Sequence, residues 1–270
     1  WDPVNDIIYF ANKIALHVSN PDLTKREVLR QSSVIYDPLG ILSPITVRAK
    51  IFMQLLWKQN LDWDQTLPEI LIGEWDNIRL DLVKGTETEI PRWYFSNTSA
   101  DAEDRIVHVF TDASQKAYGA CAYIVSGANS SLIMSRNRVA PLKPISIPRL
   151  ELMGAVVGAR LCEHILSNVK CSRVYLWSDS MIVLSWLKST KKQPVFVSNR
   201  VTEIKELTKD YEWRYCPTKS NPADLLSRGI SADQFENSDL WLHGPEWIAK
   251  TVKWPPSMDA DETFAIAESD

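Results

Sequence analysis

Four acidic residues stand where the neighbouring sequence makes an isolated carboxylate unfavourable. Asp112 follows the apolar run IVHVF, and Asp179 follows the apolar run VYLW. Glu151 has leucines and a methionine around it near the start of a predicted helix, and Asp224 opens another predicted helix after Asn-Pro-Ala. A carboxylate in apolar surroundings has a large desolvation cost unless it is paired or bound to a cation. We expect the four acids to meet at one edge of a sheet, where hard divalent cations would relieve their repulsion.

Each acid also has a simpler interpretation. Asp179 and Asp224 could be N-caps of the helices at which they stand. Asp112 could be a turn residue, and Glu151 could be a first-turn acid that interacts with the helix dipole. The combination of the four positions, and no single one of them, favours a metal-binding cluster.

The pattern between residues 105 and 230 predicts the elements that would position this cluster. Three β-rich runs, IVHVFTDAS, AYGACAYIV and SSLIMSRNRV, are separated by short polar breaks and indicate an antiparallel meander. Pro148 stands at a natural N1 position for a helix through about residue 168. A strand (RVYLWS), helices over 179–190 and 196–209, a strand (YEWRYC) and a short helix over 223–228 follow. This order predicts an α/β fold with a mixed five-stranded sheet and flanking helices.

The first hundred residues are predicted to be mainly helical. Residues 6–18 are apolar-rich and favour extended structure, and residues 24–60 favour helix, with Thr24 as the N-cap and Glu27 three residues later. An Asp-Pro-Leu-Gly turn at 37–40 interrupts this segment, and a further helix is predicted over 67–83. The polar, irregular stretch at 84–104 is the predicted domain boundary. Residues 255–270 are predicted to be a frayed acidic tail.

The composition is that of an ordinary globular protein. Hydrophobic residues make up 45% and charged residues 24% of the 270 residues, which excludes a disordered or fibrous chain. No apolar run approaches the roughly 18 residues of a membrane span, and no signal peptide opens the chain, so we expect no membrane partner. The chain begins at Trp1 without an initiator methionine, which suggests a part of a longer protein. The four cysteines form no CxxC pair and are expected to be buried thiols: Cys121, Cys162, Cys171 and Cys216.

The formal charge of −4 conceals an uneven distribution along the chain. A net negative charge taken alone argues against nucleic acid as a partner. Residues 131–230, however, contain 16 Lys and Arg residues against 8 Asp and Glu residues, and acidic segments flank this block on both sides. The block could simply be a solvated face, or it could bind phosphates. Its candidate phosphate-binding residues are Arg136, Arg138, Lys188, Lys191, Lys192 and Arg200.

Four short motifs around the acids resemble the ribonuclease H domain of retroelement reverse transcriptases. They are TDAS at 111–114, PRLEL at 148–152, WSDS at 177–180 and NPADLLSRG at 221–229. The segment at 33–64 is similar to the region between polymerase and ribonuclease H in Pao/BEL-type LTR retrotransposons. IPRWYF at 90–95 and LWLHGPEWI at 240–248 also resemble that family. The resemblance extends over roughly residues 1–250.

The resemblance implies a fragment of a pol polyprotein. Residues 1–22 would end the polymerase palm, 23–100 would form a helical thumb and connection, 101–230 the ribonuclease H-like domain, and 231–270 an acidic linker toward integrase. The polymerase itself would be inactive here, because no Tyr-x-Asp-Asp motif remains. Polymerase and integrase would be its partners in the polyprotein, and its location would be cytoplasmic, within virus-like particles.

The resemblance also implies a mechanism and roles for individual residues. Asp112 would bridge two Mg²⁺ ions, for which Mn²⁺ could substitute. Asp224 would help to hold the ion that activates the attacking water, and Glu151 and Asp179 would hold the ion beside the leaving 3′ oxygen. The substrate would be the RNA strand of an RNA/DNA hybrid, cleaved to 5′-phosphate and 3′-hydroxyl ends. Ser114 would contact the substrate backbone, and Asn221 and Arg228 would order the last acid.

One departure from related domains concerns a histidine that many of them carry shortly before the last aspartate. Here the loop is Tyr-Cys-Pro-Thr at 215–218, and no histidine lies between Asp179 and Asp224. Proton transfer would then use water or Lys219.

Two alternatives to a nuclease remain open at this stage. The Pao segment around residues 25–120 often bears the label of an aspartic peptidase, but such an enzyme needs an Asp-Thr/Ser-Gly loop, and TDAS lacks the glycine. The second alternative is a non-catalytic module that keeps the fold and binds nucleic acid.

Overall fold

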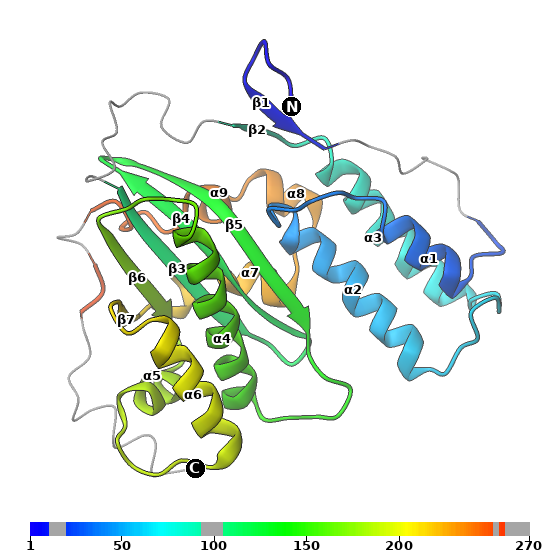
Figure 1. The fold of residues 1–270 in the computed structure, drawn as a ribbon. Helices are drawn as coiled ribbons and strands as arrows, with labels where there is room; N and C mark the ends of the chain where they lie inside the picture. Colours follow the sequence, from blue (N-terminus) through cyan, green and yellow to red (C-terminus); the bar gives the residue numbers. More distant parts are fainter. Residues whose placement is uncertain (11–19, 93–104, 251–253, 257–270) are drawn as a thin grey trace.

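A mixed five-stranded sheet forms the centre of the molecule (Figure 1). The computed structural model describes residues 1–10, 20–92, 105–250 and 254–256. The strand order in the sheet is β5-β4-β3-β6-β7, with the first three strands antiparallel and β6 and β7 parallel to β3. The predicted α/β fold with a mixed five-stranded sheet is therefore confirmed. The strands are β3 (Arg105–Ala113), β4 (Ala117–Ser126), β5 (Asn129–Val139), β6 (Arg173–Ser178) and β7 (Glu212–Tyr215).

Alternating side chains of the central strand β3 face two different helical layers. Val107 and Val109 pack with Leu161 of α4 on one face, and Phe110 packs with Leu226 of α7 on the other. This alternation is the period of two that a strand buried on both faces requires. Figure 1 shows α4 across one face and α7, α8 and α9 on the other. The helices of this part are α4 (Ile147–Leu166), α5 (Met181–Lys188), α6 (Val195–Leu207), α7 (Ala223–Arg228), α8 (Ala232–Glu236) and α9 (Asp239–His243).

The N-terminal part is helical as predicted. The helices are α1 (Lys25–Ser32), α2 (Ser43–Lys58) and α3 (Glu69–Gly85). The hydroxyl of Thr24 accepts a hydrogen bond from the backbone N–H of Glu27, which confirms the predicted N-cap. Strand β1 (Ile7–Tyr9) covers part of the segment 6–18 and pairs with β2 (Glu89–Pro91), a short strand inside the stretch that was predicted to be irregular. Residues 11–18 of the first stretch and 93–104 of the second lie outside the described residues, and α3 continues to Gly85 at the start of the second.

The turn before α2 contacts β5, which is an outer strand of the sheet. The backbone N–H of Ser135 donates to the Leu39 carbonyl over 2.8 Å, and the side-chain amide of Asn137 donates to the Ser43 carbonyl over 3.3 Å. Gly40 has φ of +73°, and a Cβ there would lie 2.3 Å from the Ser135 carbonyl oxygen. Only glycine fits this conformation and this close approach. The Asp-Pro-Leu-Gly turn thus protects an edge strand that would otherwise offer unpaired backbone groups.

A continuous apolar cluster connects the helical part to the sheet. It contains Leu42 and Phe52 from the segment around α2, Phe110 and Tyr123 from the sheet, and Trp241 from α9. The helices α1 to α3 therefore share a core with the sheet. The division of the chain at about residue 100 stays a prediction, made from the polar stretch at 84–104 and from the resemblance.

The segment after residue 230 is folded, which corrects the prediction of a linker there. Phe235 and Trp241 are each 0% exposed, because α8 and α9 cover the sheet face beside α7. The hydroxyl of Tyr123 donates to the Trp241 carbonyl over 2.8 Å, and the indole N–H of Trp241 donates to the Ile41 carbonyl over 2.8 Å. The acidic residues of this segment concealed its apolar face. Of the predicted tail at 255–270, residues 257–270 lie outside the described part.

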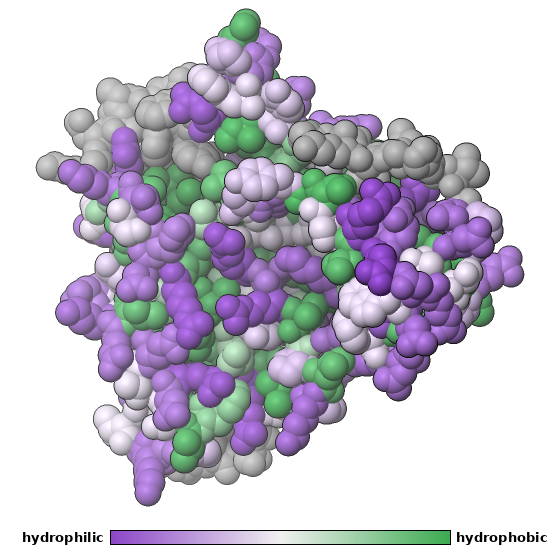
Figure 2. Space-filling view, turned by 45° about the vertical axis from the view of Figure 1, so that its right-hand side comes forward, coloured by the Kyte–Doolittle hydropathy of each residue, from purple (hydrophilic) through white to green (hydrophobic). Residues whose placement is uncertain are grey.

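Two further expectations concern cysteines and membranes. The four cysteines are free thiols, and Cys121, Cys162 and Cys216 are buried as predicted, with Cys171 half-buried. Within the described ranges, no helix combines the length and the apolarity that crossing a bilayer requires. Hydrophilic and hydrophobic side chains are interspersed over the face shown in Figure 2.

An aromatic cluster on the sheet face that α7, α8 and α9 cover encloses a neutral histidine. His108 is 0% exposed, stacks on Tyr175 and Trp177, and meets the edge of Trp254. The indole N–H of Trp177 donates to Nδ1 of His108 over 3.1 Å, so the ring proton lies on Nε2. Within the described residues Nε2 has no hydrogen-bond partner. Burial lowers the pKa of His108 from 6.5 to about 3.

This depressed pKa predicts a specific pH dependence of stability. The unfolded chain binds a proton at His108 near pH 6.5 and the folded chain does so only near pH 3, so the stability contribution is present above pH 6.5 and is lost as the pH falls toward 3. Wild type should therefore lose about 1.4 kcal/mol per pH unit relative to His108→Gln between pH 6 and pH 4. The measurement is the difference between the two urea-unfolding free energies at each pH. A difference that does not vary with pH would contradict the prediction, and the exposed His164→Gln is the matched control.

Candidate active site

Two of the four acids stand at the C-terminal ends of neighbouring parallel strands, Asp112 within β3 and Asp179 directly after β6. Thr111 of β3 and Ser178 of β6 lie opposite each other in the register, so Asp112 and Asp179 come next at the same edge of the sheet. Asp112 is 6% exposed, and Asp179 follows the last residue of β6. Because adjacent strands lie about 4.8 Å apart, this register places the two carboxylates side by side.

The other two acids come from helix N-termini that approach the same edge. Glu151 is in the first turns of α4, and its Oε2 accepts a hydrogen bond from the Ser180 hydroxyl over 2.5 Å, directly after Asp179. Asp224 is the second residue of α7, and its Oδ1 accepts from Nε of Arg228. The backbone at Gly154 lets α4 approach β3 closely, since a Cβ there would lie 2.7 Å from the Asp112 carbonyl oxygen. The fold thus brings the four predicted acids to one end of the sheet.

Burial and mutual repulsion raise the pKa of three of the acids, Asp112, Glu151 and Asp179. The pKa of Asp112 is raised from 3.8 to about 7, mainly by burial and also by the charges of Asp179 and Asp224, against the lowering effect of the hydrogen bond from Ser227. Burial also raises the pKa of Asp179, with Asp224 adding to the rise, and it raises the pKa of Glu151, with Asp179 adding to the rise. The four acids therefore interact as one electrostatic group, which is the situation that a bound cation would relieve.

Several hydroxyl groups that orient the acids were not identified from the sequence. The Ser227 hydroxyl donates to Oδ2 of Asp112, and the Ser180 hydroxyl donates to Glu151. A hydrogen bond from Thr218 lowers the pKa of Asp179. Ser227 lies three residues after Asp224 on α7, inside the motif NPADLLSRG. Its contact with Asp112 could be recognised only from the packing of α7 on β3.

The donor set suits a hard divalent cation, because it consists of carboxylate oxygens. No three His, Cys, Asp or Glu side chains of the described residues, however, converge closely enough to hold a metal ion as they stand. Each of the four carboxylates instead accepts a hydrogen bond from the protein: Asp112 from Ser227, Glu151 from Ser180, Asp179 from Asn221 and Asp224 from Arg228. Each of these bonds uses one oxygen of a carboxylate that has about four acceptor sites on its two oxygens, so the bonds leave room for a metal ion.

Asn221 and Arg228, predicted to order the last acid, have separate roles. Arg228 binds Asp224. Asn221 is 1% exposed, and its side-chain amide donates to the Thr111 carbonyl over 3.0 Å and to Oδ1 of Asp179 over 3.3 Å. It therefore connects β3 to the strand-end acid of β6.

Ser114, predicted to contact substrate, makes bonds within the protein. Its hydroxyl donates to the Ser227 carbonyl over 2.7 Å and accepts from the backbone N–H of Lys116 over 3.1 Å. Ser114 thus ties the turn after β3 to α7, next to the serine that binds Asp112.

The basic block divides into two places in the fold. Arg136 and Arg138 are exposed on the outer strand β5, and Asn137 between them is two strands away from Asp112 through Gly119, about 10 Å. Lys188, Lys191 and Lys192 are exposed at the end of α5 and in the loop before α6.

Arg200 belongs to the second of these places and is held by the protein. Its guanidinium lies 3.5 Å from the ring centroid of Phe196, and its Nε approaches the sulfur of Met153 at 2.8 Å. The stacking fixes the arginine beside α4, with Arg149 on the same ring at 5.3 Å.

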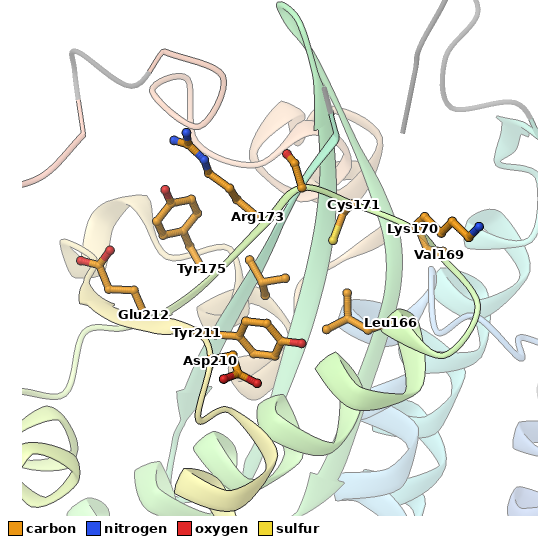
Figure 3. A pocket seen from close by; sticks show the side chains of 11 residues that line it. Leu166, Val169, Lys170, Cys171, Arg173, Tyr175, Asp210, Tyr211 and Glu212 are labelled. Carbon is orange, nitrogen blue, oxygen red and sulfur yellow. The ribbon is translucent and has the colours of Figure 1, made fainter. Parts of the chain in front are cut away.

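A hollow of about 650 Å³ lies at the opposite end of β6 from the acids (Figure 3). Leu166, Cys171, Arg173 and Tyr211 are among its lining residues, and it is formed by the end of α4 and the starts of β6 and β7. The length of β6 therefore separates this hollow from the acid cluster.

Comparisons with known proteins agree with this architecture. The model of the family described as "Pao retrotransposon-like RNaseH-like domain" matches residues 24–180. A search of the curated proteins finds no match to this chain. Among solved structures, the N-terminal RNase H domain of a Mycobacterium tuberculosis protein, a fusion with maltose-binding protein, is 15% identical, with a TM-score of 0.37; the match covers 49% of this chain and 96% of that chain.

Three matched structures come from a foamy viral protease-reverse transcriptase. One, in complex with double-stranded DNA, is 11% identical with a TM-score of 0.45, and the match covers 77% of this chain and 34% of that chain. Another, in complex with RNA/DNA hybrid, is 9% identical with a TM-score of 0.34, and covers 65% of this chain and 27% of that chain.

The sheet order, the helices on its two faces and the strand-end acids define a ribonuclease H-like protein. The matched range includes α1 to α3 as well as the first four strands of the sheet and α4. This chain belongs to the Pao retrotransposon-like RNaseH-like domain family.

Proposed function

We propose that this chain is a metal-dependent endonuclease that hydrolyses the RNA strand of RNA/DNA hybrids during retrotransposon reverse transcription. The observation that carries the proposal is the convergence of Asp112, Glu151, Asp179 and Asp224 at one edge of the sheet, with the pKa of Asp112 raised to about 7. Acids with a purely structural role on a surface are not buried in this way. A group of carboxyls with perturbed pKa values is typical of catalytic sites.

The four acids would hold two Mg²⁺ ions, or Mn²⁺, which stabilise the attacking and leaving oxygens of an in-line displacement. The residues around them would set the orientation of each carboxylate. Ser227 holds Oδ2 of Asp112, and Ser180 holds Oε2 of Glu151 while it caps α5. The arginine at 228 balances the charge of Asp224.

Substrate binding would use the two basic places, which lie on either side of the sheet strands that hold Asp112 and Asp179. Lys188, Lys191 and Lys192 would contact phosphates on the side of α5 and α6, and Arg136 and Arg138 on the side of β5. Such contacts position a duplex without reading its bases, and 2′-hydroxyls distinguish its RNA strand. The reaction would take place in cytoplasmic virus-like particles, with the remainder of a pol polyprotein as the partner.

A non-catalytic nucleic-acid-binding module is the second candidate. It is favoured by the lack, within the described residues, of three His, Cys, Asp or Glu side chains arranged to hold a metal ion. Lys219, the protein group proposed to replace the missing loop histidine, is exposed beside Asn221 on the turn before α7.

Substrate preference separates the two candidates. The purified chain is incubated with Mg²⁺ and, in separate reactions, with four labelled nucleic acids. They are RNA/DNA hybrid, double-stranded RNA, double-stranded DNA and single-stranded RNA. We expect cleavage in the RNA strand of the hybrid, with 5′-phosphate and 3′-hydroxyl ends. Tight binding of hybrid without any cleavage would favour the non-catalytic module.

A further inference from the structure

A small groove lies beside the acid cluster, between the helical part and the sheet. Its volume is about 280 Å³, and α2 and α3 form one wall while the turn after β3 and the end of α7 form the other. Ile51 and Leu55 of α2 are half-buried and supply an apolar surface inside it. The groove therefore exists only because α2 packs against the ribonuclease H-like part.

The rim of the groove is basic. Lys116, Arg228 and Arg48 line it together with a single acidic residue, Glu74. Lys116 is exposed, and within the described part of the chain no ion pair to it is found. The side chain of Arg228 is 63% exposed and uses its Nε for Asp224. Arg48 is anchored by Asp81 and is the fixed member of the set. Because Asp81 and Asp224 already pair with Arg48 and Arg228, Lys116 supplies the positive charge that the rim offers to an anion.

Short hydrogen-bonded connections join this rim to the proposed catalytic acids. Lys116 donates its backbone N–H to Ser114, Ser114 donates to the Ser227 carbonyl, and Ser227 donates to Asp112. Arg228 binds Asp224 directly. A nucleic-acid strand that passes the acids would therefore reach the rim within a short distance.

We propose that this groove binds a single-stranded nucleotide that continues beyond the hybrid at the cleavage site. Lys116 and Arg228 pair with its phosphate, and Ile51 and Leu55 contact its sugar and base. A volume of about 280 Å³ is near the lower limit of about 300 Å³ for ordinary ligand pockets, which fits one nucleotide and excludes a duplex. The proposal rests on the proposed function, because it places the strand relative to the acids.

The test compares hybrids with blunt ends and hybrids with a short single-stranded extension on each strand in turn. Binding is measured by fluorescence anisotropy in chains that carry Asp112→Asn, so that the hybrid stays intact. We expect one extended hybrid to bind about tenfold more tightly than the blunt hybrid, the effect of about one charge-assisted contact. Lys116→Glu should remove this preference and change the affinity for the blunt hybrid much less.

Lys170→Glu is the matched control, because Lys170 is exposed beside the hollow at the other end of the sheet. It should keep the preference for the extended hybrid. The proposal is overturned if no extended hybrid binds more tightly than the blunt one, or if Lys116→Glu weakens both hybrids equally. Failure of the proposed function is separate, since it appears as intact hybrid with the unmodified chain and Mg²⁺, whatever the binding preference.

Discussion

An Asp112→Asn variant should lose hybrid cleavage by about 10³-fold or more while it still binds hybrid. Asp112 is the most buried of the four acids and interacts with both Asp179 and Asp224. Replacing its carboxylate by an amide removes the charge that a divalent cation needs, and a loss of about 4 kcal/mol of transition-state stabilisation corresponds to about 10³-fold in rate. The measurement is single-turnover cleavage of labelled hybrid with Mg²⁺.

The same variant should be more stable than wild type when no divalent cation is present. The folded-state pKa of Asp112, about 7 against an ordinary value of 3.8, means that ionisation is more costly in the folded chain. This cost appears as the pH rises above the unfolded value and is complete above pH 7. Asp112→Asn should therefore gain about 2 to 4 kcal/mol at pH 8 and much less at pH 4.5.

Asp210→Asn is a matched control for both effects, because Asp210 is exposed and lines the hollow at the far end of the sheet. It should cleave and unfold like wild type. Equal cleavage by Asp112→Asn and wild type would show that the site lies elsewhere. A less stable Asp112→Asn chain at pH 8 in EDTA would contradict the electrostatic account of the acid cluster.

Trp241→Ala should destabilise the fold by about 3 to 5 kcal/mol, the usual cost of removing a buried aromatic side chain. Trp241 is 0% exposed, its indole N–H donates to the Ile41 carbonyl, and it belongs to the cluster that joins α2 to the sheet. The urea-unfolding free energy measures the effect. Trp1→Ala is the control, because Trp1 is 62% exposed and should cost little. Equal stability of the two variants would show that the segment after residue 230 does not support the fold.

Local patterns were sufficient to predict most elements of this protein. The alternation in IVHVFTDAS, the proline at 148 and the cap at Thr24 are properties of neighbouring residues, and each predicts one strand or helix terminus. The strand-end positions of Asp112 and Asp179 likewise follow from where each apolar run stops, and the parallel register of β3 and β6 places them together. The expected convergence of the acids needed no information beyond these boundaries and the topology.

Contacts between distant segments account for what the sequence did not predict. The pairing of Leu39 with Ser135 joins residues far apart in the chain, and no local pattern specifies it. The segment with α8 and α9 was predicted from the resemblance to be an acidic linker toward integrase, although Phe235 and Trp241 are buried within it. Ser227 could be linked to Asp112 only after α7 was placed on β3.

The distribution of charge had a similar limit. The basic block at 131–230 is continuous in the sequence, but the fold divides it between β5 and the α5–α6 region. Lys116, the exposed cation beside the acids, lies outside that block and was not selected from the sequence. Position on the surface, and not position in the chain, decides which cations can meet one phosphate backbone.

Cleavage of RNA/DNA hybrid as Mg²⁺ is titrated tests the central claim most directly. The purified chain is incubated with a hybrid labelled on its RNA strand, and EDTA is added in a parallel series. We predict cleavage of the RNA strand that rises with Mg²⁺, disappears with EDTA and is absent in Asp112→Asn. Hybrid that stays intact over a wide range of both Mg²⁺ and Mn²⁺ would contradict the claim that these four acids form a nuclease site.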